Sequence, residues 1–164
     1  MPFDHDLLDV ARYLLERESP TQATLRRSVS TAYYALFHLL TQEACFNWAR
    51  PEHRNNLARA FDHKQMIAAS DRQRAKYKDA AENSIEKHLF DVAFNFAQLQ
   101  QKREFADYDY SFELSLDQAR LTIGQAEAAF KSWEIIRKEQ AAQDYLFTLL
   151  IRERAAKPLE WGPR

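Results

Sequence analysis

The chain has 164 residues and a formal net charge of −1, so its overall charge gives no reason to expect binding to nucleic acid. It is long enough to bury a hydrophobic core without disulfides or metal ions. Two glycines and five prolines interrupt a sequence rich in Ala, Leu, Glu, Gln, Lys and Arg, a composition that favours helices and lacks the turns of a sheet protein.

Cysteine content and hydropathy indicate the compartment. The single cysteine, Cys45, excludes an internal disulfide and fits a reducing environment. No apolar run approaches the roughly 20 residues that span a bilayer. The N-terminal segment MPFDHDLLDV lacks the basic region of a signal peptide. We therefore expect a cytoplasmic protein that makes no contact with a membrane.

Apolar residues recur at helical spacing along most of the chain. Asp4 and Ser19 are the expected caps of the first two helices, and Ser115 with Gln118 has the spacing of a capping box. The last pattern is long for one helix, and its apolar stripe lapses near residues 138–143, where we expect a break. The expected helices cover approximately residues 4–18, 20–49, 55–69, 84–106 and 116–154.

The most informative helix covers residues 25–40, LRRSVSTAYYALFHLL. Its apolar residues form one face, and packing with a partnered hydroxyl would be enough to explain Tyr33 and Tyr34. The order of residue types says more. In residues 27–38, the pattern R-x-x-S-x-x-Y-Y-x-x-F-H resembles the signature helix of the HEPN family, which consists of small all-helical domains.

A second stretch, LQQKREFADYDY at residues 99–110, also resembles this family. In HEPN ribonucleases an Arg at a helix end is followed by a His, with four to six residues between the two, and two such motifs meet across a dimer interface to cleave RNA. Arg103 matches the Arg, but Tyr108, Asp109 and Tyr110 occupy the positions where the His is expected. The ending R-x-x-A-D-Y resembles a variant found in standalone members of the family.

The resemblance implies a set of site residues. His63, in the segment A-F-D-H-K, aligns with a His common in the family. An alternative explanation for Arg103 is an ion pair with Asp107 one turn later, which would end the helix. The catalytic candidates are Arg103, Asp107 and Tyr108, and the binding candidates are Arg27, Tyr33, Tyr34 and His63.

The charge distribution is uneven although the net charge is small. Residues 50–78 carry eight Lys/Arg and three Asp/Glu, a net +5, and residues 104–144 carry four and nine, a net −5. This asymmetry suits either a basic face for phosphate or a complementary patch for a second copy of the chain. No metal-ligand spacing and no glycine-rich phosphate loop occurs, so we expect neither a metal site nor a cofactor.

These patterns together predict an all-α, up-and-down bundle of about five main helices, HEPN-like, in a single domain over residues 1–164 with a frayed tail from about residue 155. Gly124 inside the last helical pattern is expected to mark a close helix contact.

The resemblance implies a homodimer that binds RNA or a nucleotide weakly, as a degenerate ribonuclease would. The alternative is a non-catalytic dimeric interaction subunit, for example the partner of a nucleotidyltransferase-type protein in a toxin–antitoxin type pair. The surroundings of Arg103 distinguish the two. An open cleft favours RNA, whereas an Arg103–Asp107 pair closed within the bundle favours the interaction subunit.

Overall fold

The computed structural model describes residues 2–152, and this part of the chain is helical with no strand. The all-α prediction is confirmed, whereas the tail expected from about residue 155 lies outside the described residues. A short 3₁₀ helix at Pro51–His53 precedes α3. The α-helices are α1 (Phe3–Tyr13), α2 (Gln22–Phe46), α3 (Arg54–Ala58), α4 (His63–Tyr77), α5 (Ile85–Tyr108), α6 (Leu116–Ile136) and α7 (Gln140–Leu150).

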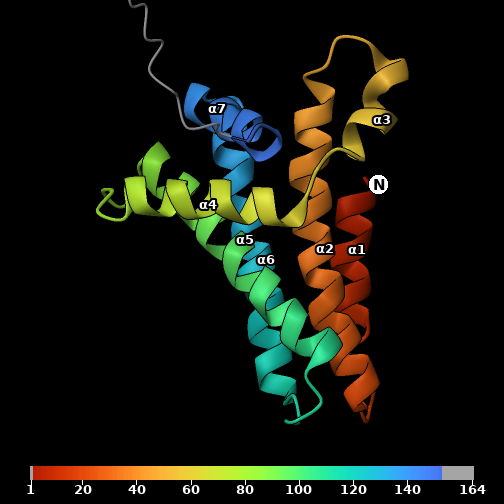
Figure 1. Ribbon diagram of the computed structural model, residues 1–164. Coiled ribbons are helices and arrows are strands. Elements are labelled where there is room, and N and C mark those ends of the chain that lie inside the picture. Colours follow the sequence, from red (N-terminus) through yellow and green to blue (C-terminus); the bar gives the residue numbers. More distant parts are fainter. Residues whose placement is uncertain (1, 153–164) are drawn as a thin grey trace, which may run out of the picture.

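Four helices, α1, α2, α5 and α6, run alternately down and up and form the body of the bundle (Figure 1). Within it, α2 packs against α1, α5 and α6. Helix α4 departs from this pattern, because it crosses the long helices and packs against α5 and α7 (Figure 1). None of the described helices combines the length and the apolar character that crossing a membrane would require.

Several helices begin after a side chain that accepts a hydrogen bond from the first turn, but this capping residue is not always the expected one. Ser115 and Gln118 form the predicted capping box at the start of α6. Thr21, and not Ser19, caps α2, since its side chain accepts a hydrogen bond from a backbone N–H three residues later. Asp4 is not a cap, because α1 begins one residue earlier and the carboxylate is buried within its first turn.

Residues 54–77 contain two helices in place of the single helix expected. The expected helix over residues 55–69 is interrupted at residues 59–62, where Asp62 caps α4 by accepting a hydrogen bond from the N–H of Gln65 at 2.9 Å. Residues 70–77, beyond the expected end of that helix, continue α4 to Tyr77. The break expected near residues 138–143 occurs at residues 137–139, between α6 and α7.

The core near the middle of α2 matches the expected helix face. Tyr33 and Leu40 are fully buried, as are Phe96 and Leu99 of α5, and the ring centroids of Tyr33 and Phe96 lie 5.6 Å apart. Phe37 is only half-buried, at the edge of this contact. The interface between α2 and α5 therefore places Tyr33 where its hydroxyl can meet polar groups at the margin of the core.

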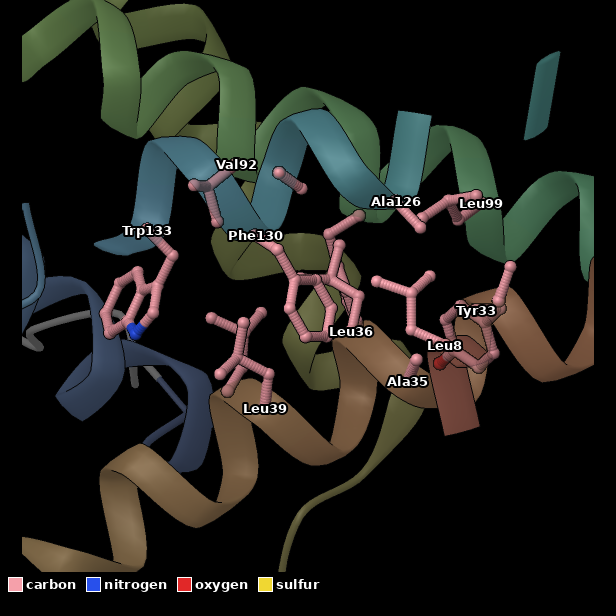
Figure 2. Close-up of a cluster of buried hydrophobic side chains, with 14 of the residues drawn as sticks. Leu8, Tyr33, Ala35, Leu36, Leu39, Val92, Leu99, Ala126, Phe130 and Trp133 are labelled. Carbon is pink, nitrogen blue, oxygen red and sulfur yellow. The ribbon is translucent and has the colours of Figure 1, made fainter. Parts of the chain in front are cut away.

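Further along the bundle, α2 packs against α6. Figure 2 shows Leu36 and Leu39 of α2 facing the side of the core that contains Phe130 and Trp133. The indole of Trp133 is almost completely buried, and its N–H has no hydrogen-bond partner among the described residues. Apolar packing is therefore what holds this side chain.

The expectation for Gly124 is wrong. This glycine lies on the exposed face of α6, and a Cβ added to it would meet no atom within 4 Å. Alanine is favoured over glycine in a helix by about 1 kcal/mol. We therefore predict that Gly124→Ala raises the free energy of unfolding by about that amount, measured by denaturant titration. A lower stability would reveal a close contact at this face that the structure does not contain.

Candidate functional site

Most of the predicted site residues lie in one group at the junction of α2, α4 and α5, which we call the Arg103 cluster. It combines a guanidinium, a carboxylate, an imidazole and several aromatic rings. Its members are Ser30, Tyr33, Tyr34 and Phe37 from α2, His63 from α4, and Gln100, Arg103, Asp107 and Tyr108 from α5.

Helical spacing brings these residues together. On α2 the contributing residues are three or four positions apart, so that they share one face. Arg103 and Asp107 are one turn apart on the last two turns of α5. His63 is the first residue of α4, and the cap formed by Asp62 fixes the point at which this helix meets α2. The cluster therefore depends on three helix segments that are distant in sequence.

Arg103 is buried within the bundle, with an exposed fraction of only 8%. Its Nη1 lies 3.7 Å from Oδ2 of Asp107, the ion pair that the sequence spacing offered as the alternative explanation. Its Nη2 donates to Oε1 of Gln100 at 3.4 Å, and its Nε has no hydrogen-bond partner among the described residues. The polar contacts of this guanidinium are thus few and long.

Aromatic rings supply the remaining contacts of the guanidinium. Its central carbon lies 5.4 Å from the ring centroid of Tyr33, 5.9 Å from that of Tyr34 and 6.0 Å from that of Tyr108. These distances lie within the range of cation–π attraction, which gains strength where water is excluded. The rings therefore both stabilise and cover the charge of Arg103.

Tyr33 also connects the cluster to α4, because its hydroxyl lies 2.5 Å from Nδ1 of His63. Burial raises the pKa of Tyr33, against the opposing effect of the Arg103 charge, so the phenol is neutral and acts as donor. Burial, followed by the Arg103 charge, lowers the pKa of His63. A neutral imidazole with its proton on Nε2 accepts at Nδ1. Phe37 stacks on the same imidazole with ring centroids 4.7 Å apart.

Ser30 is a member of the cluster that the sequence did not identify. It is buried, and its hydroxyl donates to Oδ2 of Asp107 at 3.2 Å. The same oxygen of Asp107, Oδ2, thus faces both the Ser30 hydroxyl and the Arg103 guanidinium. The helical spacing could have identified Ser30, because it lies one turn before Tyr33 and Tyr34 in the motif and therefore shares their face of α2.

Arg27 is not part of the cluster, since it is exposed and the described residues show no hydrogen bond or ion pair between it and Arg103. The preceding residue, Arg26, reaches the C-terminal end of α5 instead. Its guanidinium donates to the carbonyl oxygens of Ala106 at 3.1 Å, Asp109 at 2.7 Å and Phe112 at 2.6 Å. Ala106 is in the last turn of α5, where carbonyls lack intrahelical partners, and Asp109 and Phe112 lie in the loop that follows, so Arg26 ties the end of α5 to this loop.

Beside the cluster, α4 and α5 enclose an open groove of about 470 Å³. Lys64 and Arg74 of α4 supply its positive charges, and Asp71 of α4 and Glu104 of α5 supply its negative ones, with Nη1 of Arg74 lying 2.8 Å from Oδ1 of Asp71. Arg103 does not line this groove, although its neighbour Gln100 does. Lys64 can therefore meet a phosphate in the groove and Arg74 can do so in competition with Asp71, whereas Arg103 could do so only after its covering rings had moved.

The chemistry of the cluster is limited by these contacts. No group of three or more His, Cys, Asp and Glu side chains among residues 2–152 could hold a metal ion. The imidazole of His63 is already engaged by Tyr33 and Phe37. The site thus holds a covered cation and a partnered imidazole.

No protein-family model matches the chain, and no curated protein or solved structure matches it either. Membership of the HEPN family stays a prediction from the quoted motifs.

The state of His63 predicts a pH dependence. Its pKa in the folded protein is below the ordinary value of 6.5, so its contribution to stability is complete above about pH 6.5 and is lost as the pH falls through the folded pKa. We predict that the stability advantage of the wild type over His63→Asn shrinks between pH 8 and pH 5, measured by urea titration. His53→Asn, at an exposed histidine, is the control. If the stability difference between the wild type and His63→Asn did not vary with pH, the conclusion that the imidazole of His63 is neutral would be wrong.

Proposed function

We propose that this chain is a HEPN-like, homodimeric interaction subunit that does not catalyse RNA cleavage. The observation that carries the proposal is the closed environment of Arg103, which is 8% exposed, paired with Asp107 and faced by tyrosine rings. A residue that stabilises charge on a phosphate during cleavage has to present its N–H groups to that phosphate. Arg103 presents them to the bundle.

The absence of a positioned general base supports the same proposal. His is the side chain best suited to proton transfer near neutral pH, and such a group typically accelerates a reaction about 10²–10⁴-fold. Tyr108 lies at the position expected for the His, and its side chain is directed at Arg103. His63 is held by the Tyr33 hydroxyl on the other side of the cluster.

An interaction subunit needs an apolar surface for its partner, and such a surface adjoins the cluster. Phe105, Tyr108 and Tyr110, near the end of α5, are all exposed. Large exposed aromatic residues grouped in this way are typical of protein–protein interfaces. We propose a second copy of the chain as the partner, because two-fold homodimers are the commonest oligomers and the HEPN resemblance implies one. By that resemblance, a nucleotidyltransferase-type protein is a further candidate partner.

Weak binding of RNA or a nucleotide is the second candidate function. The net charge of +5 on residues 50–78 favours it, and Lys64 lines the groove between α4 and α5 together with the paired Arg74 and Asp71 and with Glu104. Its contacts would be with phosphate, and its affinity would fall with rising salt. This candidate function does not require the Arg103 guanidinium to move away from the tyrosine rings that cover it.

Sedimentation velocity over a range of concentrations tests the assembly. We expect a dimer, and we expect Tyr108→Ser to shift the equilibrium toward monomer, since this side chain is 70% exposed beside the cluster. Tyr13→Ser is a matched control, because Tyr13 of α1 is also 70% exposed. A wild-type protein that stays monomeric at every concentration would refute the homodimer.

Incubation with total RNA tests catalysis. We expect no cleavage by the wild type, and weak, salt-sensitive binding that falls in the double variant Lys64→Gln, Arg74→Gln. No binding at low salt would eliminate the second candidate and leave the interaction subunit. Metal-independent cleavage that Asp107→Ala abolishes would show that the variant ending is catalytic and would refute the proposal.

A further inference from the structure

A second groove, between the end of α5 and the start of α6, is mainly apolar and differs in character from the groove beside α4. Its volume is about 400 Å³, within the range of about 300–1,000 Å³ that is usual for small-molecule sites. Neutral polar side chains, Gln98, Gln101, Gln118 and Thr122, complete its lining. The apolar lining residues are Val29, Phe105, Ala106, Phe112, Leu114 and Leu121.

One charged residue, Lys102, lines this groove. Its ammonium group is half-buried and donates to the neutral amide oxygen of Gln125 at 2.6 Å. Among the residues that the structure describes, no carboxylate forms an ion pair with it. Carboxylates of the adjacent helix are engaged elsewhere, since Glu127 accepts from Arg12 at 2.6 Å and Asp117 lies 3.8 Å from Arg120.

The electrostatic state of Lys102 reflects this lack of a counter-charge. Burial lowers the pKa of Lys102, and no neighbouring carboxylate offsets that effect. Lys87 on the same helix is the contrasting case, because the hydrogen bond that it donates to Asp91 at 2.7 Å raises the pKa of Lys87. A negative group placed in the groove would give Lys102 the partner that Lys87 already has.

We propose that the groove between α5 and α6 binds a small apolar carboxylic acid, with its hydrocarbon part against Phe105 and Leu121 and its carboxylate on Lys102. The single cation matches the single charge of a carboxylate, and the surrounding amides are neutral donors that can complete its hydrogen bonds. This site goes beyond the proposed function and does not depend on it, since neither RNA binding nor dimerisation is required for the groove to bind such an acid.

Three ligands with the same eight-carbon chain test the proposal: octanoate, its neutral analogue octanamide, and octylammonium. Each is titrated into the ¹⁵N-labelled protein while backbone chemical shifts are followed. We expect shifts centred on residues 98–125, with octanoate binding about ten-fold more tightly than octanamide, the ratio expected for one charge-assisted hydrogen bond. Octylammonium should bind more weakly than either.

The variants identify the residues responsible. Lys102→Gln should bring octanoate to the affinity of octanamide, whereas Lys131→Gln, at an exposed lysine of α6 outside the groove, should leave the ratio unchanged. Leu121→Gln should weaken both ligands with little effect on folding, because Leu121 is 64% exposed. Equal affinities in the wild type, or a preference that survives Lys102→Gln, would overturn the proposal. The proposal would also be overturned if a second copy of the chain covered the groove. The protein would then be a dimer that binds no octanoate, and Leu121→Gln would convert this dimer to monomer.

Discussion

The contact between the Arg103 guanidinium and the tyrosine rings of α2 is the interaction on which the junction of three helices depends. Arg103 projects from the end of α5 onto Tyr33 and Tyr34. Tyr33 in turn hydrogen-bonds His63 at the first residue of α4. Since α4 crosses the bundle and does not run along it, this chain of contacts fixes where α4 begins relative to α2 and α5 (Figure 1).

Burying a guanidinium is costly unless it is paired, and this protein meets the cost with one carboxylate and several aromatic faces. Because these contacts occupy the Arg103 guanidinium, they also limit what this residue can do for function. HEPN ribonucleases, which the motif resembles, use this charge on RNA, whereas in this chain it is directed into the bundle and the aromatic side chains of Phe105, Tyr108 and Tyr110 are exposed beside it. Arg26 adds to the same result by holding the carbonyl end of α5, so that the segment carrying Arg103 and Asp107 has a fixed position.

Local signals in the sequence were sufficient for most of the fold. The helical periodicity of α2 and α5 and the capping box of α6 are determined by residues close in sequence, and each was predicted correctly. Tertiary contacts decided the rest. Arg26 and Arg27 are indistinguishable as residue types, but a rotation of about 100° along a helix directs one to the end of α5 and the other to solvent. Similarly, the burial of Ser30 and its hydrogen bond to Asp107 arise where α2 packs against α5, which local sequence does not reveal.

Arg103 has a structural role in this protein. Measuring the free energy of unfolding of Arg103→Met and of Arg27→Met tests this role, because Arg27 is an exposed arginine of α2. Methionine keeps much of the length of arginine and removes the charge. Arg103→Met is expected to lower the free energy of unfolding by about 2 kcal/mol or more, because Asp107 loses its counter-ion and the rings lose their cation. Arg27→Met is expected to change it by less than about 0.5 kcal/mol. An Arg103→Met protein as stable as the wild type, or more stable, would contradict the account, since functional residues are often kept at the expense of stability.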